Sequence, residues 1–253
     1  MSPLNLLDAE AAGYAEFDGA AVTEANGATI TQLEAAAFPG RGSVGYRVIK
    51  PTVGVDRSAY GTKTVSVTTA AGESFTMRCR IMVHSYEISA GGFVTTFLSA
   101  NNVASGSPDQ FGLLIWSGAG DIIVWRGYDD SVSGSNTGGF APTIDQWHEI
   151  EVKSTRATGA ATNDGTWQLW VDGVAKTAVT GKDNFHQMQY GVDTIYVGSS
   201  VASSTKGKVN YDIDNIEVFG NVVNRGKYAN PGVGCIHASP ELAGFGRVGV
   251  IAR

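Results

Sequence analysis

The stretch Trp147-His148-Glu149-Ile150-Glu151-Val152, followed by Thr166-Trp167-Gln168-Leu169-Trp170-Val171, decides the fold class of this chain. In the first stretch apolar and polar residues alternate as far as Thr155, which is the period of a β-strand with one buried face, and in the second stretch Trp167 and Leu169 share one face. Two reversal signals, Asn163-Asp164-Gly165 and Asp172-Gly173, bound the second stretch. Because Asn, Asp and Gly tolerate the backbone of tight turns, the two stretches predict strands joined by short turns.

The same pattern of short strands and turns extends over most of the chain. The 253 residues include 33 glycines, and 43% of them are hydrophobic and 17% charged, which is enough apolar material for the core of one domain. Further strands are predicted at residues 28–33, 44–49, 74–83, 93–98, 111–116, 121–126, 193–197 and 209–219. The composition favours short strands over helices. The predicted fold class is therefore all-β.

A third stretch, Tyr211-Asp212-Ile213-Asp214-Asn215-Ile216, adds a resemblance to a known family. The Trp-led strand at 147–152, the strand ending in Val171-Asp172-Gly173 and this closing strand resemble laminin-G-like domains of the concanavalin A-like lectin/glucanase superfamily. The resemblance covers about residues 14–220 and implies a two-sheet antiparallel jelly-roll sandwich. It implies no single function, since the superfamily includes lectins, hydrolases, lyases and structural domains.

Two segments flank the predicted jelly roll, which we place at residues 14–222. Residues 1–13 show no strand alternation. Residues 223–253 contain Asn230-Pro231-Gly232 and several further glycines, and cannot bury a core of their own. We therefore predict an extended N-terminal arm and an extended C-terminal arm.

Charge is distributed unevenly between the body and the C-terminal arm. The arm holds one acid, Glu241, and has a net charge of +3. Because the net charge of the whole chain is −6, residues 1–222 carry −9. Its basic residues are Arg225, Lys227, Arg247 and Arg253. We expect these four to contact acidic protein neighbours or another copy of the chain. Nucleic acid is not an expected partner, because that would favour a concentrated basic face.

The closing strand contains an acidic trio, Asp212, Asp214 and Glu217. Keeping the apolar residues on both sides of Asn215 in the core requires an inserted bulge residue there, and that bulge would turn the three acids to one face. The resemblance implies a comparison with the Glu-x-Asp and following Glu of retaining glucanases, which work with two carboxyl groups about 5 Å apart. Here the first position is the shorter Asp, and the flanking sequence matches the closing strand of non-enzymatic relatives. We therefore expect no enzyme, with no catalytic residue.

Aromatic residues beside the longest predicted loop, residues 127–142, form a second candidate site. Trp116, Trp125 and Tyr128, with the neighbouring Asp129, predict a platform on which a sugar ring could stack. The alternative is that these rings fill the core or an interface, where aromatic side chains contribute most.

Metal and cofactor sites are not expected. Asp129, Asp130, Asp172 and Asp193 carry the hard oxygen ligands that Ca²⁺ prefers, but no loop has an EF-hand-like array. Calcium therefore stays an alternative to the expectation of no metal and no cofactor.

Cys79 alternates with apolar residues of the strand predicted at 74–83 and is expected to be a buried core thiol. The histidines occur in no metal-binding motif and are expected in strands or at the surface: His84, His148, His186 and His237.

The N-terminus, Met1-Ser2-Pro3-Leu4-Asn5-Leu6-Leu7-Asp8, has no basic start and no apolar run of signal-peptide length. We expect no secretion signal, and assembly in a host cytoplasm.

The arms, the basic tail and the missing active site favour a non-enzymatic structural protein of a large assembly, namely a bacteriophage virion surface protein such as a capsid decoration or tail component. The alternatives are a carbohydrate-binding module and a glycoside hydrolase or lyase that uses the acidic trio.

Overall fold

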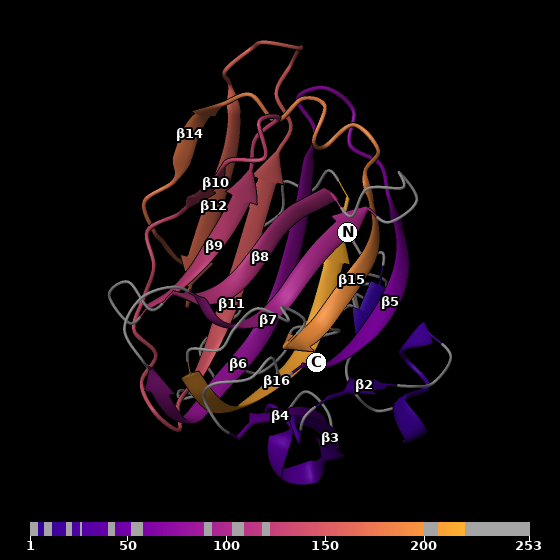
Figure 1. Cartoon of the computed structure of the whole chain (residues 1–253), viewed down its shortest axis with the longest axis vertical. Coiled ribbons are helices and arrows are strands. Elements are labelled where there is room, and N and C mark those ends of the chain that lie inside the picture. The colour runs from indigo at the N-terminus through magenta and orange to yellow at the C-terminus, as the bar shows by residue number, and fades with distance from the viewer. Residues whose placement is uncertain are drawn as a thin grey trace, which may run out of the picture.

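A computed structural model describes residues 5–7, 12–18, 22–25, 27–39, 44–51, 58–88, 93–102, 109–117, 122–199 and 207–220. These residues form two antiparallel β-sheets that lie face to face, as Figure 1 shows. The described part contains no α-helix, only short 3-10 turns such as η1 (Ala12–Tyr14) and η3 (Glu34–Ala36). None of its helices is long and apolar enough to cross a membrane. The predicted all-β sandwich is confirmed.

The first sheet, called sheet A here, contains the strands that carry the sequence motif. In spatial order it consists of β13 (Val174–Ala175), β12 (Gly165–Val171), β11 (Trp147–Thr155), β6 (Ser74–Ile88), β16 (Gly207–Phe219), β4 (Gly45–Lys50) and β3 (Thr29–Leu33). Two short strands join outside this order: β1 (Asn5–Leu7) pairs with β16, and β14 (Val179–Lys182) pairs with β12.

The second sheet, sheet B, covers one face of sheet A. In spatial order it consists of β10 (Gly134–Asn136), β9 (Ile122–Tyr128), β8 (Asp109–Ser117), β7 (Phe93–Asn102), β15 (Val192–Ser199), β5 (Ala59–Val67) and β2 (Val22–Glu24). In Figure 1 its middle strands β9, β8, β7 and β15 lie in front of the strands of sheet A.

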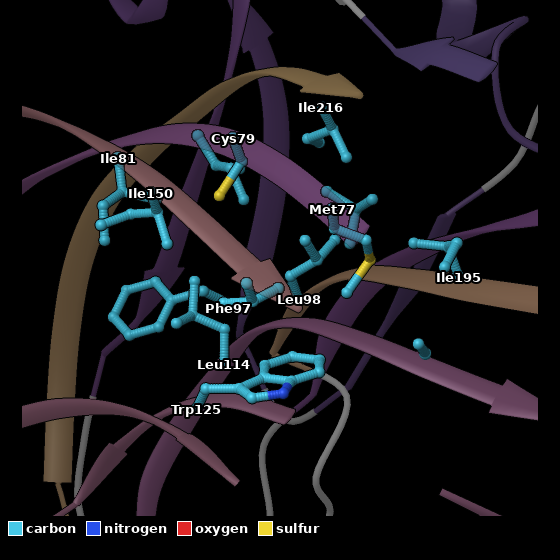
Figure 2. Close-up of a cluster of buried hydrophobic side chains, with 14 of the residues drawn as sticks. Met77, Cys79, Ile81, Phe97, Leu98, Leu114, Trp125, Ile150, Ile195 and Ile216 are labelled. Atoms are coloured by element: carbon cyan, nitrogen blue, oxygen red, sulfur yellow. The ribbon is translucent and has the colours of Figure 1, made fainter. Parts of the chain in front are cut away.

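The core lies between the two sheets and is filled by alternate residues of each strand. Figure 2 shows Met77, Cys79 and Ile81 of β6 pointing toward Phe97 and other side chains of sheet B. Cys79 is 1% exposed, and burial raises the pKa of its thiol to about 12. The prediction of a core thiol is therefore confirmed, and the thiol stays protonated at neutral pH.

Most strands lie where the alternation predicts them. β11 has the predicted bounds, Trp147–Thr155. The hairpin between β12 and β13 reverses at Asp172 (φ 50°) and Gly173 (φ 76°), the left-handed backbone that the Asp-Gly pair predicts. The pattern did not reveal the short strands β1, β2, β10, β13 and β14, nor the longer β5. β1 lies within the predicted N-terminal arm, where Leu6 pairs with Glu217 of β16.

Two bulges interrupt the pairing of β6 with β16. Val83 and Ser85 pair with the consecutive residues Tyr211 and Asn210, so His84 is an extra residue on β6. On β16, Asp214 and Glu217 pair with Arg80 and Arg78, and Asn215 there has φ 50°. The bulge predicted near Asn215 is therefore confirmed. Because an inserted residue re-aims its neighbours, both bulges change which side chains reach the outer face of sheet A.

Candidate functional site

The face of sheet A that points away from the core carries charged side chains on four neighbouring strands. These positions alternate with the core residues of the same strands, so the strand period itself gathers them on one face. We call this set the charged face: Arg47 on β4, Arg78, Arg80 and His84 on β6, Glu149 and Glu151 on β11, and Asp212, Asp214 and Glu217 on β16.

Asp212 lies at the centre of a chain of charged contacts. Its side chain is fully buried, and its carboxylate accepts hydrogen bonds from Arg47 Nε at 2.7 Å and Arg47 Nη2 at 2.8 Å. His84 Nε2 lies 2.8 Å from the same carboxylate, while His84 Nδ1 lies 2.7 Å from Asp145 Oδ1. Arg47 Nη2 also lies 3.0 Å from His84 Nε2, so the three side chains form one cluster. The hydrogen bond from Arg47 to Asp212 raises the pKa of the guanidinium, against its partial burial.

Asp214 lies two residues further along β16 and is also fully buried. We call the residues opposite one another across β16, β6 and β11 a row. Its two oxygens accept the backbone N–H groups of Phe38 at 2.7 Å and of Asn215 at 2.6 Å. Burial raises the pKa of the Asp214 carboxyl to about 6, and these hydrogen bonds and the nearby Arg80 only partly oppose that rise. In the same row Arg80 binds Glu149 at 2.9 Å, yet burial still raises the pKa of Glu149.

Glu217 lies in the third row, which has the same order of charges. Glu217 lies opposite Arg78 in the register of β16 and β6, and Arg78 Nε binds Glu151 Oε2 at 2.8 Å. The Arg78 guanidinium also lies 5.1 Å from the ring centre of Phe219. Glu217 is 7% exposed, so all three acids of the trio are buried beside positive or N–H groups of the same chain.

The bulge brings the acidic trio to one face, as predicted, but the trio does not resemble an open pair of catalytic carboxyl groups. A retaining glycosidase needs one carboxylate free to attack the sugar and one acid within reach of the leaving oxygen. Here Asp212 and Asp214 are 0% exposed and their oxygens are already bonded within the protein. The face as described can hold strands together through charge pairs.

The predicted sugar platform is divided by the structure. Trp125 is 0% exposed and its Nε1 donates to Ser154 Oγ at 3.1 Å, so it belongs to the core and offers no ring face to a sugar. This corrects its assignment to a binding platform: its position in β9 has the core-facing phase. Trp116 lies in β8 opposite Ile123, and its side chain is outside the described residues.

Tyr128 and Asp129 lie where β9 enters the predicted loop. Tyr128 is half-buried, with the Arg126 guanidinium 5.3 Å from its ring centre. Asp129 accepts hydrogen bonds from Ser131 and from the N–H of Ser133, so it holds the loop in shape. The structure therefore does not join Trp116, Trp125 and Tyr128 into one aromatic surface on its described residues.

The four aspartates considered as calcium ligands are dispersed. In the part of the chain that the structure describes, no three His, Cys, Asp or Glu side chains gather so that they could hold a metal ion. Asp172 is paired with His148 at 2.9 Å and Asp130 with His186 at 2.8 Å, while Asp193 bonds to Thr194 in β15. His84 and His148 lie in strands, and His186 is exposed. His237 and the assembly residues Arg225, Lys227, Arg247 and Arg253 lie outside the described residues.

The cation partners of the trio were not predicted from the sequence. Arg78 and Arg80 stand at alternate positions in a strand whose other positions are apolar, and this signal places both arginines on one outer face. Arg47 and His84 carried no such signal, because their approach to Asp212 depends on strand order and on a bulge. Strand order is a property of the whole sheet and not of any local stretch.

No protein-family model and no curated protein matches this chain. Solved structures do. An endo-β-1,4-glucuronan lyase from the fungus Trichoderma reesei superposes with a TM-score of 0.59 at 12% identity, over 86% of this chain and 95% of the lyase. A cellulose-induced protein gives 0.54 at 15% identity, over 81% of this chain and 93% of its own.

A third similar structure comes from a virus of bacteria. It is a conserved carbohydrate esterase from the Shiga toxin-encoding bacteriophage phi24B, with a TM-score of 0.52 at 14% identity over 86% of this chain and 97% of the esterase. At these identities the likeness defines a class of fold. This chain is a two-sheet β-sandwich of the jelly-roll kind found in those carbohydrate-related proteins.

Proposed function

We propose that this chain is a non-enzymatic structural and binding protein of a phage virion surface, whose jelly roll holds a glycan. The observation that carries the non-enzymatic part is the state of the acidic trio. Asp212 is bonded to Arg47 and His84, and Asp214 accepts two backbone N–H groups. Groups that are fully committed within the protein are poor nucleophiles and poor bases.

One property of Asp214 favours the alternative of a glycoside hydrolase. Its pKa of about 6 is the kind of raised value that a general acid needs. The same carboxyl is 0% exposed, however, and a general acid must come within hydrogen-bond reach of the leaving oxygen. Burial explains the raised pKa without a catalytic role, so we retain the non-enzymatic proposal.

The glycan-binding part of the proposal is supported by the fold and by the surface. The similar structures include a lyase and an esterase that are named for carbohydrates, although their likeness to this chain is one of fold. The exposed Tyr190 and the exposed polar side chains of the described loops can supply the stacking and hydrogen bonds that sugars require. The assembly part is supported by the basic C-terminal arm, with its net charge of +3 beside an acidic body. We propose protein subunits of the virion as its partners, and no nucleic acid or membrane.

Incubation with a panel of neutral and uronate-containing polysaccharides tests the non-enzymatic part. We expect no new reducing ends and no ultraviolet absorbance from an unsaturated product, since hydrolysis gives the first and elimination gives both. Binding to the same panel on a glycan array is expected in the same preparation. Catalytic turnover that Asp212→Asn abolishes would overturn the proposal.

A deletion of residues 223–253 tests the assembly part. The truncated chain retains every described strand, so we expect it to fold with the same unfolding midpoint as the full chain. It is expected to be absent from particles purified after co-expression with the neighbouring virion proteins. Normal incorporation of the truncated chain would contradict the role of the arm, and electron micrographs of native material would show whether particles contain the chain at all.

A further inference from the structure

The segment between β14 and β15, residues 183–191, has a wound backbone. It crosses the upper end of the sandwich in Figure 1 as an orange trace between the two strands. Hydrogen bonds run from Met188 N to Asn184 O at 3.1 Å, from Gln189 N to His186 O at 3.2 Å and from Gly191 N to Met188 O at 3.2 Å. These are the i−4 and i−3 bonds of helical turns, so residues three and four apart share a side of the segment.

Burial divides the segment into two sides that follow this spacing. The inner side chains are Asn184, Gln187 and Met188, which are at most 7% exposed. The outer side chains are His186, Gln189 and Tyr190, at positions i, i+3 and i+4. His186 has a 57% exposed side chain and Tyr190 is 59% exposed. The three side chains therefore form one outward surface, which we call the turn face.

The carboxylate of Asp130 fixes one end of the turn face from the β9–β10 loop. It accepts the backbone N–H groups of His186 at 3.0 Å and Gln187 at 2.7 Å, and His186 Nδ1 lies 2.8 Å from it. Burial alone would raise the pKa of Asp130, but these hydrogen bonds outweigh it and hold the pKa below its ordinary value. The imidazole of His186 is thereby held by Nδ1, while its side chain as a whole is 57% exposed.

Other polar side chains bind carbonyl groups of the segment. Arg156 Nε donates to Phe185 O at 2.8 Å, Thr69 Oγ1 to Met188 O at 2.5 Å, and Asn102 Nδ2 to Tyr190 O at 3.0 Å and Gly191 O at 2.9 Å. All three donors are at most 9% exposed. Three buried side chains from different strands and loops thus fix the backbone that displays an exposed tyrosine. A rigid surface of this kind loses little entropy when it binds.

A strained residue lies on the neighbouring loop. Val132 has φ 61° and is 70% exposed, although β-branched residues rarely adopt the left-handed region. It is two residues from Asp130, on a loop closed by the hydrogen bond from Val132 N to Asp129 O at 2.8 Å. Backbone strain of this kind persists where the surroundings enforce it, and such positions cluster at binding sites.

From these observations, and resting on the proposed function, we infer that the turn face is a binding site for a neutral sugar residue of a glycan. Tyr190 offers a ring face to the C–H face of the sugar. Gln189 and His186 offer an amide and an imidazole edge to its hydroxyl groups. The carboxylates of Asp129, Asp130 and Asp183 lie on or beside the segment and outnumber its neighbouring cations, Lys182 and Arg156, so a uronate would meet a net negative charge here. The site therefore favours neutral over acidic sugars.

Calorimetric titration with neutral gluco-, galacto- and manno-oligosaccharides, chosen from array hits, tests the site on the full chain. We expect Tyr190→Ala to weaken binding at least about tenfold, and Tyr190→Phe to keep it within about threefold because the ring face remains. Tyr128→Ala tests the competing platform predicted at the end of β9, and Val174→Ala, at an exposed position of β13, is the control that should leave affinity unchanged. Unfolding midpoints of all variants confirm that each is folded.

The outcomes separate this inference from the proposed function. If the wild type binds glycans and only Tyr128→Ala loses binding, the glycan-binding function stands and the turn face is the wrong site. If the wild type binds only uronate-containing chains, the inferred class of sugar is wrong. If it binds no glycan on any array, the glycan-binding part of the proposed function and the inference both fail.

Discussion

Arg47 and Asp212 form a two-point ion pair across β4 and β16, with N to O distances of 2.7 and 2.8 Å. A planar guanidinium matches a carboxylate in this way only when both side chains are held in register. Asp212 is fully buried, whereas the Arg47 side chain is 23% exposed, so the carboxylate depends on this partner more than the guanidinium does. The acids of the trio are thus parts of a cross-strand charge pattern before they are candidates for chemistry.

The first prediction concerns the loss of that carboxylate. Asp212→Asn leaves Arg47 and His84 without their shared negative partner, and we expect it to lower the free energy of unfolding by about 1.5–3 kcal/mol. Asp145→Asn is the matched control, because its 68% exposed side chain touches the same histidine. We expect at most about 1 kcal/mol there. Urea unfolding measures both, and equal losses would mean that the buried ion pair has no special weight.

The second prediction concerns the pH dependence of stability. Asp214 has a pKa of about 6 in the folded chain against 3.8 ordinarily, so the native state binds more protons than the unfolded chain between these values. Its contribution to stability is therefore fully present below pH 3.8 and is lost as pH rises toward 6. Asp214→Asn removes this titration. It also replaces an oxygen that accepts an N–H with an amide nitrogen that cannot, which adds a loss independent of pH.

The measurable quantity is the difference in unfolding free energy between the Asp214→Asn variant and the wild type. We expect this difference to shift in favour of the variant as pH rises from about 4 to about 7, because groups common to both chains cancel. Urea unfolding at four pH values measures it. A difference that stays constant across this range would show that Asp214 has the same pKa in the folded and the unfolded chain.

Local signals in the sequence predict some parts of this fold well. The alternation at Trp147–Thr155 gives the bounds of β11, and the Asp172-Gly173 pair gives the turn between β12 and β13. The bulge at Asn215 follows from a change of phase within a single strand. Each of these features depends on residues that are close in the chain, and so the sequence pattern contains them.

Features that depend on strand order were not predictable in the same way. The sequence leaves both a sugar platform and the core open for Trp125, since an alternating strand does not say which of its faces is covered, and the ring lies in the core. The partners of Asp212 come from positions 165 and 128 residues away. The turn face depends on residues such as Asn102, which bonds to Tyr190 over 88 residues. Such long-range pairings become visible only when the sheets are assembled.

The third prediction tests the bulge in β16. Asn215 has φ 50° and is 4% exposed, and its side chain lies beside the Asp214 carboxyl. Asn215→Ala is expected to cost about 1–2 kcal/mol, because alanine disfavours the left-handed region. Asn215→Gly should be neutral or stabilising, since glycine adopts this backbone freely and removes the buried amide. Thermal and urea unfolding rank the two variants. An alanine variant more stable than the glycine variant would contradict the left-handed backbone at the bulge.

The fourth prediction tests how closely the two sheets approach. A Cβ on Gly127 of β9 would lie 2.1 Å from the indole of Trp167 of β12, which is 0% exposed. Overpacking of this kind costs about 1–3 kcal/mol, so we expect Gly127→Ala to be destabilising by at least that amount. In a Trp167→Phe background the smaller ring leaves room, and the same change should cost less.

Gly173→Ala is the control: its Cβ would meet no atom within 4 Å, and its cost comes from φ 76° alone. That cost should be the same in both backgrounds within about 0.5 kcal/mol. If Gly127→Ala is also unaffected by Trp167→Phe, the indole does not set the separation of β9 and β12, and the core at this point must be looser than the structure describes.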